Sequence, residues 1–250
     1  SFFKDKAVTQ LLCEKLPVTI SLGLWSTFLI YLIAIPLGIK KAKKNGLLFD
    51  QSTSSFLAVC YAIPSFVFAI VLIVFFAGGS YWQWFPLQGL VSENFAELSF
   101  FSQVKDYLWH MCLPILSMVL GGFATLTYLT KYSFVDELSK PYVLTAKSKG
   151  LTDFQVLYGH VFRNAILIVV AALPEAVIGI FFVGNLFIEI IFNLDGIGLL
   201  GFEAISQRDY PVIFGTLFIF TLFGLILRLI GDLLYQWIDP RIDFQARGGK

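Results

Sequence analysis

Hydrophobic residues run through most of this chain in long stretches that polar segments separate. Five stretches are long enough, at about 20 mostly apolar residues, to cross a bilayer as helices. None alternates apolar and polar residues as the strands of a transmembrane barrel do. The pattern therefore predicts an all-α fold, a polytopic transmembrane helical bundle forming one domain over residues 1–250. The predicted spans are Val18–Ile39, Phe56–Ala77, Trp109–Thr130, Asn164–Leu186 and Val212–Ile238.

The composition agrees with a membrane protein. Hydrophobic residues make up 57% of the chain and charged residues only 14%, against roughly 25% charged in an ordinary soluble domain. The 18 Lys and Arg nearly balance the 17 Asp and Glu, so net charge says nothing about nucleic acid. Only the placement of the charges is informative.

Basic residues gather in alternate connections between the spans. The positive-inside rule puts the first and third connections and the C-terminus in the cytoplasm, with residues 78–108 and 187–211 as external loops. Five spans then leave the N-terminus outside, and the chain starts at Ser1 without an initiator Met, so we expect that an earlier span is missing from this sequence. The cytoplasmic cations are Lys40, Lys41, Lys43, Lys44, Lys131, Lys140, Lys147, Lys149, Arg163, Arg241, Arg247 and Lys250.

The second external loop, residues 187–211, is unusually apolar and contains three glycines. We expect it to pack as short helical or re-entrant structure, because non-helical backbone at membrane depth needs protein or a water-filled cavity around it. Prolines also occur inside predicted spans, which is compatible with ordinary packing or with a bundle that must bend. They are Pro36, Pro64, Pro114 and Pro174.

The polar segment between the third and fourth spans carries the signals of two short helices. Ser139 can cap a helix whose first turn holds Pro141, and Gly150 can end it in a left-handed conformation. Thr152 and Gln155 then fit the capping box of a second helix. A helical elbow this well specified predicts that a partner docks there, and the alternative is an amphipathic hairpin on the lipid headgroups.

Three ionisable residues fall within predicted spans, where a charge is costly and marks a candidate functional site. Arg228 and Asp232 lie four apart on one helix, and we expect them to pair with each other. Glu175 has no nearby cation in sequence, so it is a candidate pore-lining residue or a protonated acid that donates to a carbonyl. His110 and His160 lack companions at metal-ligand spacing, so we expect no metal site.

The elbow also carries a family pattern. The motif Y-V-x-T-A-x-x-K-G-L at Tyr142–Leu151, followed by H-x-x-R-N-A at 160–165, resembles the cytoplasmic EAA loop of binding-protein-dependent ABC transporter permeases. The resemblance is to the dipeptide and oligopeptide (DppB/OppB-like) branch, and within it to the YejB-type members. RDYPV at 208–212 and DPRID at 239–243 extend it over nearly the whole chain, although Thr145 stands where the motif's name has Glu.

The resemblance implies a permease subunit of an ATP-binding-cassette importer, with the MetI-like fold, that forms a peptide translocation pathway in a bacterial inner membrane. Residues 131–163 would be the cytoplasmic coupling loop, which inserts into a groove on a separate ATPase. The implied partners are a second permease subunit, two ATPase subunits and a periplasmic solute-binding protein. The implied coupling residues are Tyr142, Thr145, Ala146, Lys149, Gly150, Leu151, Thr152 and Asp153.

The chain is expected to bind no cofactor and to catalyse no reaction. It has no G-x-x-x-x-G-K-[ST] sequence to cradle phosphates, so ATP and Mg²⁺ would bind to the partner subunits. A membrane-embedded enzyme would need a Ser/His, Asp/Asp or H-E-x-x-H constellation at membrane depth, and the sequence offers none. A proton-coupled secondary transporter fits an isolated Glu175, but it leaves the capped elbow unexplained.

Overall fold

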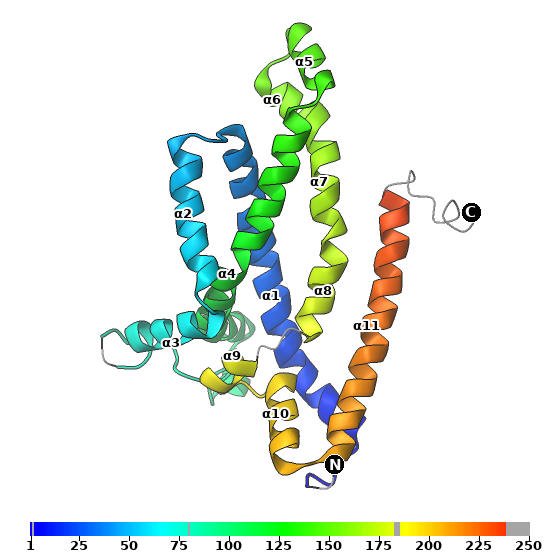
Figure 1. Ribbon diagram of the computed structural model, residues 1–250. Helices are drawn as coiled ribbons and strands as arrows, with labels where there is room; N and C mark the ends of the chain where they lie inside the picture. The colour runs from blue at the N-terminus through cyan, green and yellow to red at the C-terminus, as the bar shows by residue number, and fades with distance from the viewer. Residues whose placement is uncertain (2, 80, 183–185, 239–250) are drawn as a thin grey trace, which may run out of the picture. The chain divides into compact units, whose positions relative to one another are not determined.

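The computed structural model describes residues 1–250 except 2, 80, 183–185 and 239–250. Within this part the chain forms helices joined by turns and loops, with no strand, so the all-α prediction is confirmed (Figure 1). The helices are α1 (Val8–Lys43), α2 (Leu48–Ala62), α3 (Ser65–Phe76), the 3₁₀-helix η1 (Phe95–Glu97), α4 (Phe100–Leu138), α5 (Pro141–Ser148), α6 (Asp153–Val156), the π-helix η2 (Leu157–Val161), α7 (Phe162–Ala171), α8 (Leu173–Phe182), α9 (Leu186–Ile191), α10 (Ile197–Gln207) and α11 (Tyr210–Ile238).

Four helical stretches of the described chain are long and apolar enough to cross a membrane: Val8–Lys43, Phe100–Leu138, Asp153–Ala176 and Tyr210–Leu233. They overlap the first, third, fourth and fifth predicted spans. The helices α1 and α4 have 36 and 39 residues, which is about 54 and 58 Å at 1.5 Å per residue against a hydrocarbon core of about 30 Å. Helix α4 therefore includes parts of both segments that the sequence assigned to its flanking loops.

The second predicted span, Phe56–Ala77, is wrong as a single helix. The helices α2 and α3 bend by 94° at a short break, which makes the pair a broken span or a re-entrant segment. Pro64 lies at the break with φ −59° and ψ 145°. It has no N–H to donate, and its ring disfavours a helical conformation for the residue before it. Pro114, by contrast, lies inside α4 without ending it.

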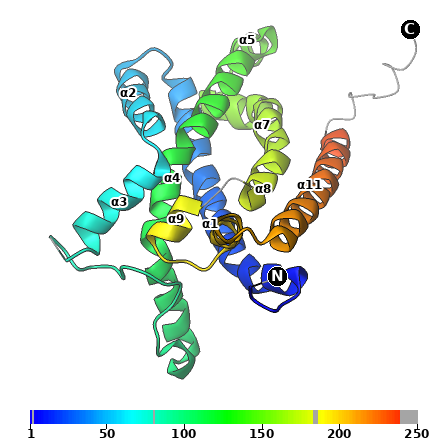
Figure 2. The same ribbon diagram turned by 60° about the horizontal axis from the view of Figure 1, so that its bottom comes forward.

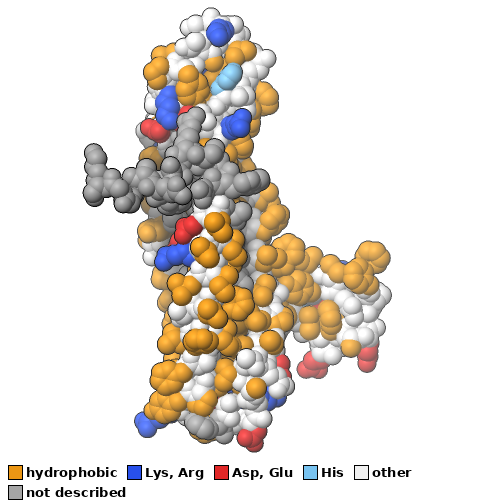
Figure 3. All heavy atoms as spheres, turned by 90° about the vertical axis from the view of Figure 1, so that its right-hand side faces the viewer, with side chains coloured by type: hydrophobic (Ala, Val, Ile, Leu, Met, Phe, Trp, Pro, Cys, Tyr) orange, Lys and Arg blue, Asp and Glu red, His pale blue; other side chains and the backbone are white. Residues whose placement is uncertain are grey.

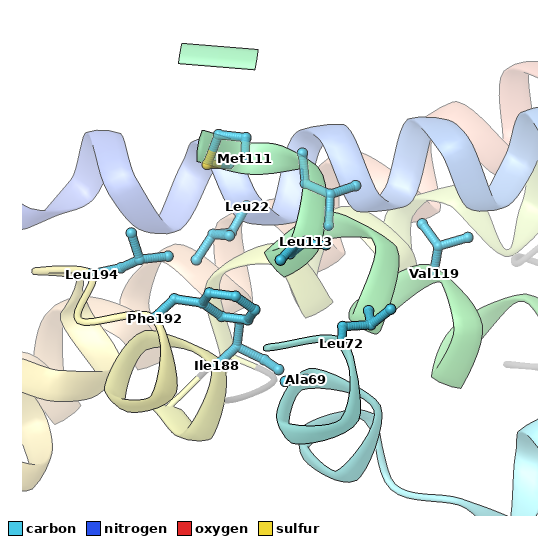
Figure 4. Packing of buried hydrophobic residues seen from close by; sticks show 10 residues of the cluster. Leu22, Ala69, Leu72, Met111, Leu113, Val119, Ile188, Phe192 and Leu194 are labelled. Carbon is cyan, nitrogen blue, oxygen red and sulfur yellow. The ribbon is translucent and has the colours of Figure 1, made fainter. Parts of the chain in front are cut away.

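The chain divides into two compact units, and several long helices contribute to both. The first unit comprises Ser1–Ile30, Val59–Gly122 and Gly179–Phe223. Its core forms where the α9 segment meets α1, α3 and α4, and Figure 2 shows α9 beside α3. Figure 4 shows Phe192 and Ile188 of this segment among side chains from those three helices.

Residues 187–211 include most of α9 and all of α10, and both short helices are packed within the first unit. Leu200 and Ala204 of α10 are buried against Leu11 and Leu12 of α1 and against Val212 of α11. The prediction that this segment forms short packed helices is confirmed.

The second unit comprises Tyr31–Ala58, Phe123–Ile178 and Gly224–Lys250. Its core includes the elbow, because α5, α6 and η2 pack on the ends of α1 and α4. The buried residues are Ile39, Ala42, Phe134, Val143, Ala146, Val156, Leu157, Val161 and Ala165.

Hydrophobic side chains cover the outer surface of α11 (Figure 3). Leu217, Phe218, Leu225 and Leu229 are each about 60% or more exposed. The most apolar 18-residue window of Tyr210–Leu233 buries none of its residues within this chain. A face of this kind requires lipid or another protein against it.

Candidate functional site

The first helix of the elbow begins one residue later than predicted. Lys140 occupies the N-cap position of α5 and makes no side-chain cap, and Pro141 is the first helical residue. The Ser139 hydroxyl instead donates to the carbonyl of Asp136 at 2.6 Å. The predicted Ser139 cap is therefore wrong, because Ser139 belongs to the turn that leaves α4, and because Pro141 removes one of the N–H groups that a cap would satisfy.

The turn between the two elbow helices has the predicted geometry. Gly150 has φ +84°, in the left-handed region. The Thr152 hydroxyl accepts from the Gln155 N–H at 3.3 Å, and the Gln155 side-chain oxygen accepts from the Thr152 N–H at 2.9 Å. These two bonds form the capping box at the start of α6, so both predictions are confirmed.

A buried carboxylate holds the two ends of the elbow together. Glu137, at the end of α4, is 6% exposed and accepts from the Tyr142 hydroxyl at 2.7 Å and from the Asn164 amide at 3.1 Å. It also accepts from the ammonium group of Lys140. Burial, together with the hydrogen bond to Glu137, raises the pKa of Tyr142, and the bond to Glu137 raises the pKa of Lys140. Both groups therefore remain protonated donors at neutral pH.

Sequence reasoning did not single out Glu137. Two features of the sequence could have indicated its role. Glu137 lies just before the Tyr142–Leu151 motif, and the second motif contains Asn164, which can donate to it. Through Glu137 the last turn of α4 is bonded to α5 and to α7, so the elbow is fixed to both of the helices that it connects.

A second buried cluster joins α1, α2 and α4 in the same unit. Lys41 is fully buried and donates to the Asp50 carbonyl and to the hydroxyls of Thr53 and Ser54, at 2.7–2.9 Å. Lys131 donates to the Asp50 carboxylate at 2.7 Å, and the Lys41 ammonium lies 3.0 Å from the other carboxylate oxygen. Two of the basic residues assigned to the cytoplasmic surface are thus buried around one acid.

The structure separates the predicted coupling residues into buried and exposed groups. Ala146 is 6% exposed and packs inward against the elbow's core, so its small side chain serves internal packing in this chain. Tyr142 and Leu151 are half-buried. The other predicted coupling residues are exposed: Thr145, Lys149, Gly150, Thr152 and Asp153.

Exposed apolar side chains on the elbow were not predicted. Leu144 and Phe154 are each 67% exposed and Tyr158 is 49% exposed. The rings of Phe154 and Tyr158 lie 4.7 Å apart between centroids. Across the turn, Lys147 forms an ion pair with Asp153 at 2.9 Å. The elbow therefore presents an aromatic and aliphatic surface beside a charged turn, which suits a protein partner better than water.

The three ionisable residues of the spans line one cavity in the second unit. It has a volume of about 350 Å³ and lies between α8 and α11, lined by Ala171, Pro174, Glu175, Ile178, Arg228, Gly231 and Asp232. Among the described residues no ion pair within 4.0 Å joins these charges, so the predicted pairing of Arg228 with Asp232 is wrong. Both side chains are exposed, and an exposed pair of this spacing is worth only about 0.3–0.5 kcal/mol.

A third polar site lies in the first unit, at the start of α10. Glu189 is 0% exposed, and its carboxylate accepts from the Thr19 hydroxyl at 3.0 Å and from the Leu199 N–H at 2.8 Å. Thr19 in turn accepts from the Ile197 N–H at 2.9 Å. A carboxylate at this place satisfies the free N–H groups of a helix start. Within the described residues, no group of three or more His, Cys, Asp or Glu could hold a metal ion.

The fold is similar to that of solved transporters. A structure of the MetNI methionine ABC transporter in an inward-facing conformation aligns with a TM-score of 0.69, covering 92% of this chain and 97% of that chain at 14% identity. An amino acid ABC transporter aligns with a TM-score of 0.57, covering 94% of this chain and 95% of the other. These similarities show that the helical bundle has the fold of ABC transporter chains.

The chain belongs to the family of binding-protein-dependent transport system inner membrane components, whose model matches residues 34–244. It is 56% identical over 247 residues to the peptidoglycan transport system permease protein YejB of Agrobacterium fabrum, covering 99% of this chain and 68% of that protein. It is equally similar to the inner membrane ABC transporter permease protein YejB of Escherichia coli O157:H7. It is 34% identical to the oligopeptide transport system permease protein AppB of Bacillus subtilis, covering 96% of this chain and 74% of AppB.

Proposed function

We propose that this permease forms the translocation pathway for peptides that a periplasmic binding protein delivers. Relatives named for peptidoglycan transport and for oligopeptide transport support this substrate class, because peptides are the chemistry that the two have in common. The family and fold do not favour the alternative of a proton-coupled secondary transporter.

The observation that carries the proposal is the elbow. The hydrogen bonds of Glu137 and of the capping box hold the elbow in a defined conformation without any partner. The same elbow leaves Leu144, Phe154 and Tyr158 exposed beside the Gly150 turn. We propose that this surface binds a separate ATPase subunit on the cytoplasmic side. ATP and Mg²⁺ bind to that partner, and this chain catalyses no reaction of its own.

The complete importer in this proposal contains a second permease subunit, two ATPase subunits and the binding protein. The second permease covers part of the apolar surface that α11 leaves exposed. Glu175, which is exposed at the cavity between α8 and α11, faces the translocation pathway.

A pair of glycine substitutions tests the role of the elbow. A Cβ added at Gly150 or at Gly159 would meet no atom within 4 Å, but only Gly150 has a positive φ. Gly150→Ala should cost about 1–2 kcal/mol of local conformational energy and shift the Thr152 cap, whereas Gly159→Ala, within η2, should not. We expect Gly150→Ala to lower both ATPase co-purification and peptide-dependent ATP hydrolysis in the assembled importer.

Both variants should insert in the membrane normally, because Gly150 lies outside the candidate spans and the methyl group added at Gly159 would meet no atom within 4 Å. If Gly150→Ala co-purifies with the ATPase and couples hydrolysis to uptake as well as Gly159→Ala does, the elbow is a solvated connection and the proposal is wrong.

A further inference from the structure

The cavity between α8 and α11 carries an unbalanced charge. Its lining includes two carboxylates, Glu175 and Asp232, and one guanidinium, Arg228. The other four lining residues among those described are apolar or lack a side chain: Ala171, Pro174, Ile178 and Gly231. With all three groups ionised, the described part of the lining has a formal charge of −1, because one guanidinium offsets only one of the two carboxylates.

The two helices meet at one close contact at this level. A Cβ on Gly231 would lie 2.7 Å from Cβ of Pro174, so the backbone of α11 passes directly beside the proline ring of α8 and leaves no room there for a larger side chain. Glu175 follows Pro174, and Arg228 lies one helical turn from Gly231. The charged side chains therefore lie at a common level along the two helices.

The apolar surroundings of the cavity make an ionised side chain without a counter-ion or water costly in free energy. Leu225, Leu229 and Leu233 of the same α11 segment are 61%, 60% and 58% exposed. Leucines as exposed as these are typical of a surface that faces lipid or another chain. Ionisable groups at membrane depth pair with one another or line a hydrated path. Since no ion pair within 4.0 Å joins the three among the described residues, a hydrated path is the arrangement that agrees with the open cavity.

The volume also limits what can enter. About 350 Å³ is at the lower end of the range for small-molecule sites, which is roughly 300–1,000 Å³. A cavity of this size accommodates one end of a peptide rather than a whole oligopeptide. A single positive charge at that end would complete the charge balance of the lining.

We infer that this cavity is a contact site for the ammonium group at the amino terminus of a peptide in transit. Glu175 and Asp232 face the ammonium group, and Arg228 keeps the site from holding two uncompensated negative charges. The inference rests on the proposed function, because it assumes that peptides pass along this face of the permease.

Charge-selective thiol labelling tests the site without relying on the binding protein's own preference for substrate. The complete importer would carry Ala171→Cys in a variant whose native Cys13, Cys60 and Cys112, all free, are replaced. It would be treated with aminoethyl methanethiosulfonate, a cation, or with sulfonatoethyl methanethiosulfonate, an anion. Ile168→Cys is the matched control, because Ile168 is 52% exposed on α7 and is not part of the cavity lining.

We expect the cation to react with the thiol of the Ala171→Cys variant about tenfold or more faster than the anion, after correction for their rates with a free thiol, since a cleft of one charge sign concentrates counter-ions by roughly 10–10³-fold. The isosteric substitutions Glu175→Gln and Asp232→Asn, made together, should reduce this ratio to about one. Trialanine, added with the binding protein and ATP, should slow labelling of the Ala171→Cys variant but not of the Ile168→Cys variant.

Other results would overturn the inference. One is an Ala171→Cys thiol that reacts with neither reagent, which would mean that the second permease covers the cavity. Another is a preference for the cationic reagent that persists after both substitutions, Glu175→Gln and Asp232→Asn. Normal trialanine uptake by the importer with Glu175→Gln and Asp232→Asn, at an unchanged half-saturating concentration, would refute the peptide contact while leaving peptide transport intact. Failure of the unsubstituted importer to take up any peptide would instead refute the proposed function.

Discussion

The start of α10 offers a quantitative test of how a buried carboxylate shapes the segment 187–211. A Cβ added at Gly196 would lie 2.3 Å from a carboxylate oxygen of Glu189. Real Cβ atoms essentially never approach another atom more closely than 3.0 Å, so this contact would be 0.7 Å too short. The carboxylate cannot simply move aside, because Thr19 and the Leu199 N–H bond to it and the side chain is 0% exposed. Gly196→Ala should therefore destabilise α10 by about 1–3 kcal/mol, the usual cost of overpacking.

Glu189→Ala should cost more. It leaves the Thr19 hydroxyl and the Leu199 N–H without their acceptor. Each unsatisfied buried donor costs about 1–3 kcal/mol, so a loss of roughly 2–6 kcal/mol is expected unless water enters. In that background the Gly196→Ala methyl group meets vacated space. The two substitutions should then combine to cost less than the sum of their separate effects, with a coupling of about 1–3 kcal/mol.

Hydrogen exchange of the α10 amides in detergent measures the local opening free energy for all three variants. Gly201→Ala is the control on the same helix, because its Cβ would meet nothing within 4 Å. It should be neutral or stabilising by up to about 1 kcal/mol. If Gly196→Ala behaves like Gly201→Ala, or if the effects of Gly196→Ala and Glu189→Ala simply add, the carboxylate does not occupy the space at the helix start and this account of the segment fails.

Two further predictions concern other parts of the chain. Asp50→Ala should destabilise the second unit by about 3–5 kcal/mol, because it leaves Lys41 and Lys131 as buried charges without a counter-ion; an unchanged thermal transition of the purified protein would contradict this. Labels placed at Lys149 and at the C-terminus should be accessible only from the cytoplasm and a label at Glu93 only from outside, and protection assays in intact cells and in inverted vesicles would reveal the opposite orientation.

Local rules predicted the elbow well because its turn is set by a few adjacent residues. A left-handed Gly150 and the T-x-x-Q box at Thr152 depend only on backbone geometry and on bonds three residues apart, and both are present. Four of the five spans predicted from the long apolar runs likewise overlap helices long enough to cross a membrane, since bilayer thickness alone fixes their minimum length. The sequence alone could not predict that Pro64 breaks the helix at the α2–α3 junction. Pro114 has the same chemistry and lies within an unbroken helix.

The buried charges could not be predicted because their partners are distant in sequence. Glu189 bonds to Thr19, which is 170 residues away, and Asp50 bonds to Lys131, which is 81 residues away. A rule that counts lysines along the chain assigns Lys131 to the cytoplasmic surface, and no local pattern distinguishes it from exposed neighbours. The sequence shows the glycines that flank the start of α10. It does not show why glycine is needed there, because the Glu189 carboxylate that occupies the space beside them is placed by the tertiary structure.

The proposed coupling has a physical route within the second unit. Leu157 and Val161 of η2 are buried in the same core as Val143 and Val156 of the elbow, so a shift of the elbow would disturb the packing at the start of α7. From Phe162 to Glu175 the helical stretch extends about 20 Å at 1.5 Å per residue, and the Pro174–Gly231 contact lies beside its end. A displacement of the elbow by an ATPase would therefore reach the charged cavity through packed helices. A route of this kind predicts that loosening the Pro174–Gly231 contact weakens coupling without weakening the binding of the ATPase, which separates it from any effect of the elbow surface itself.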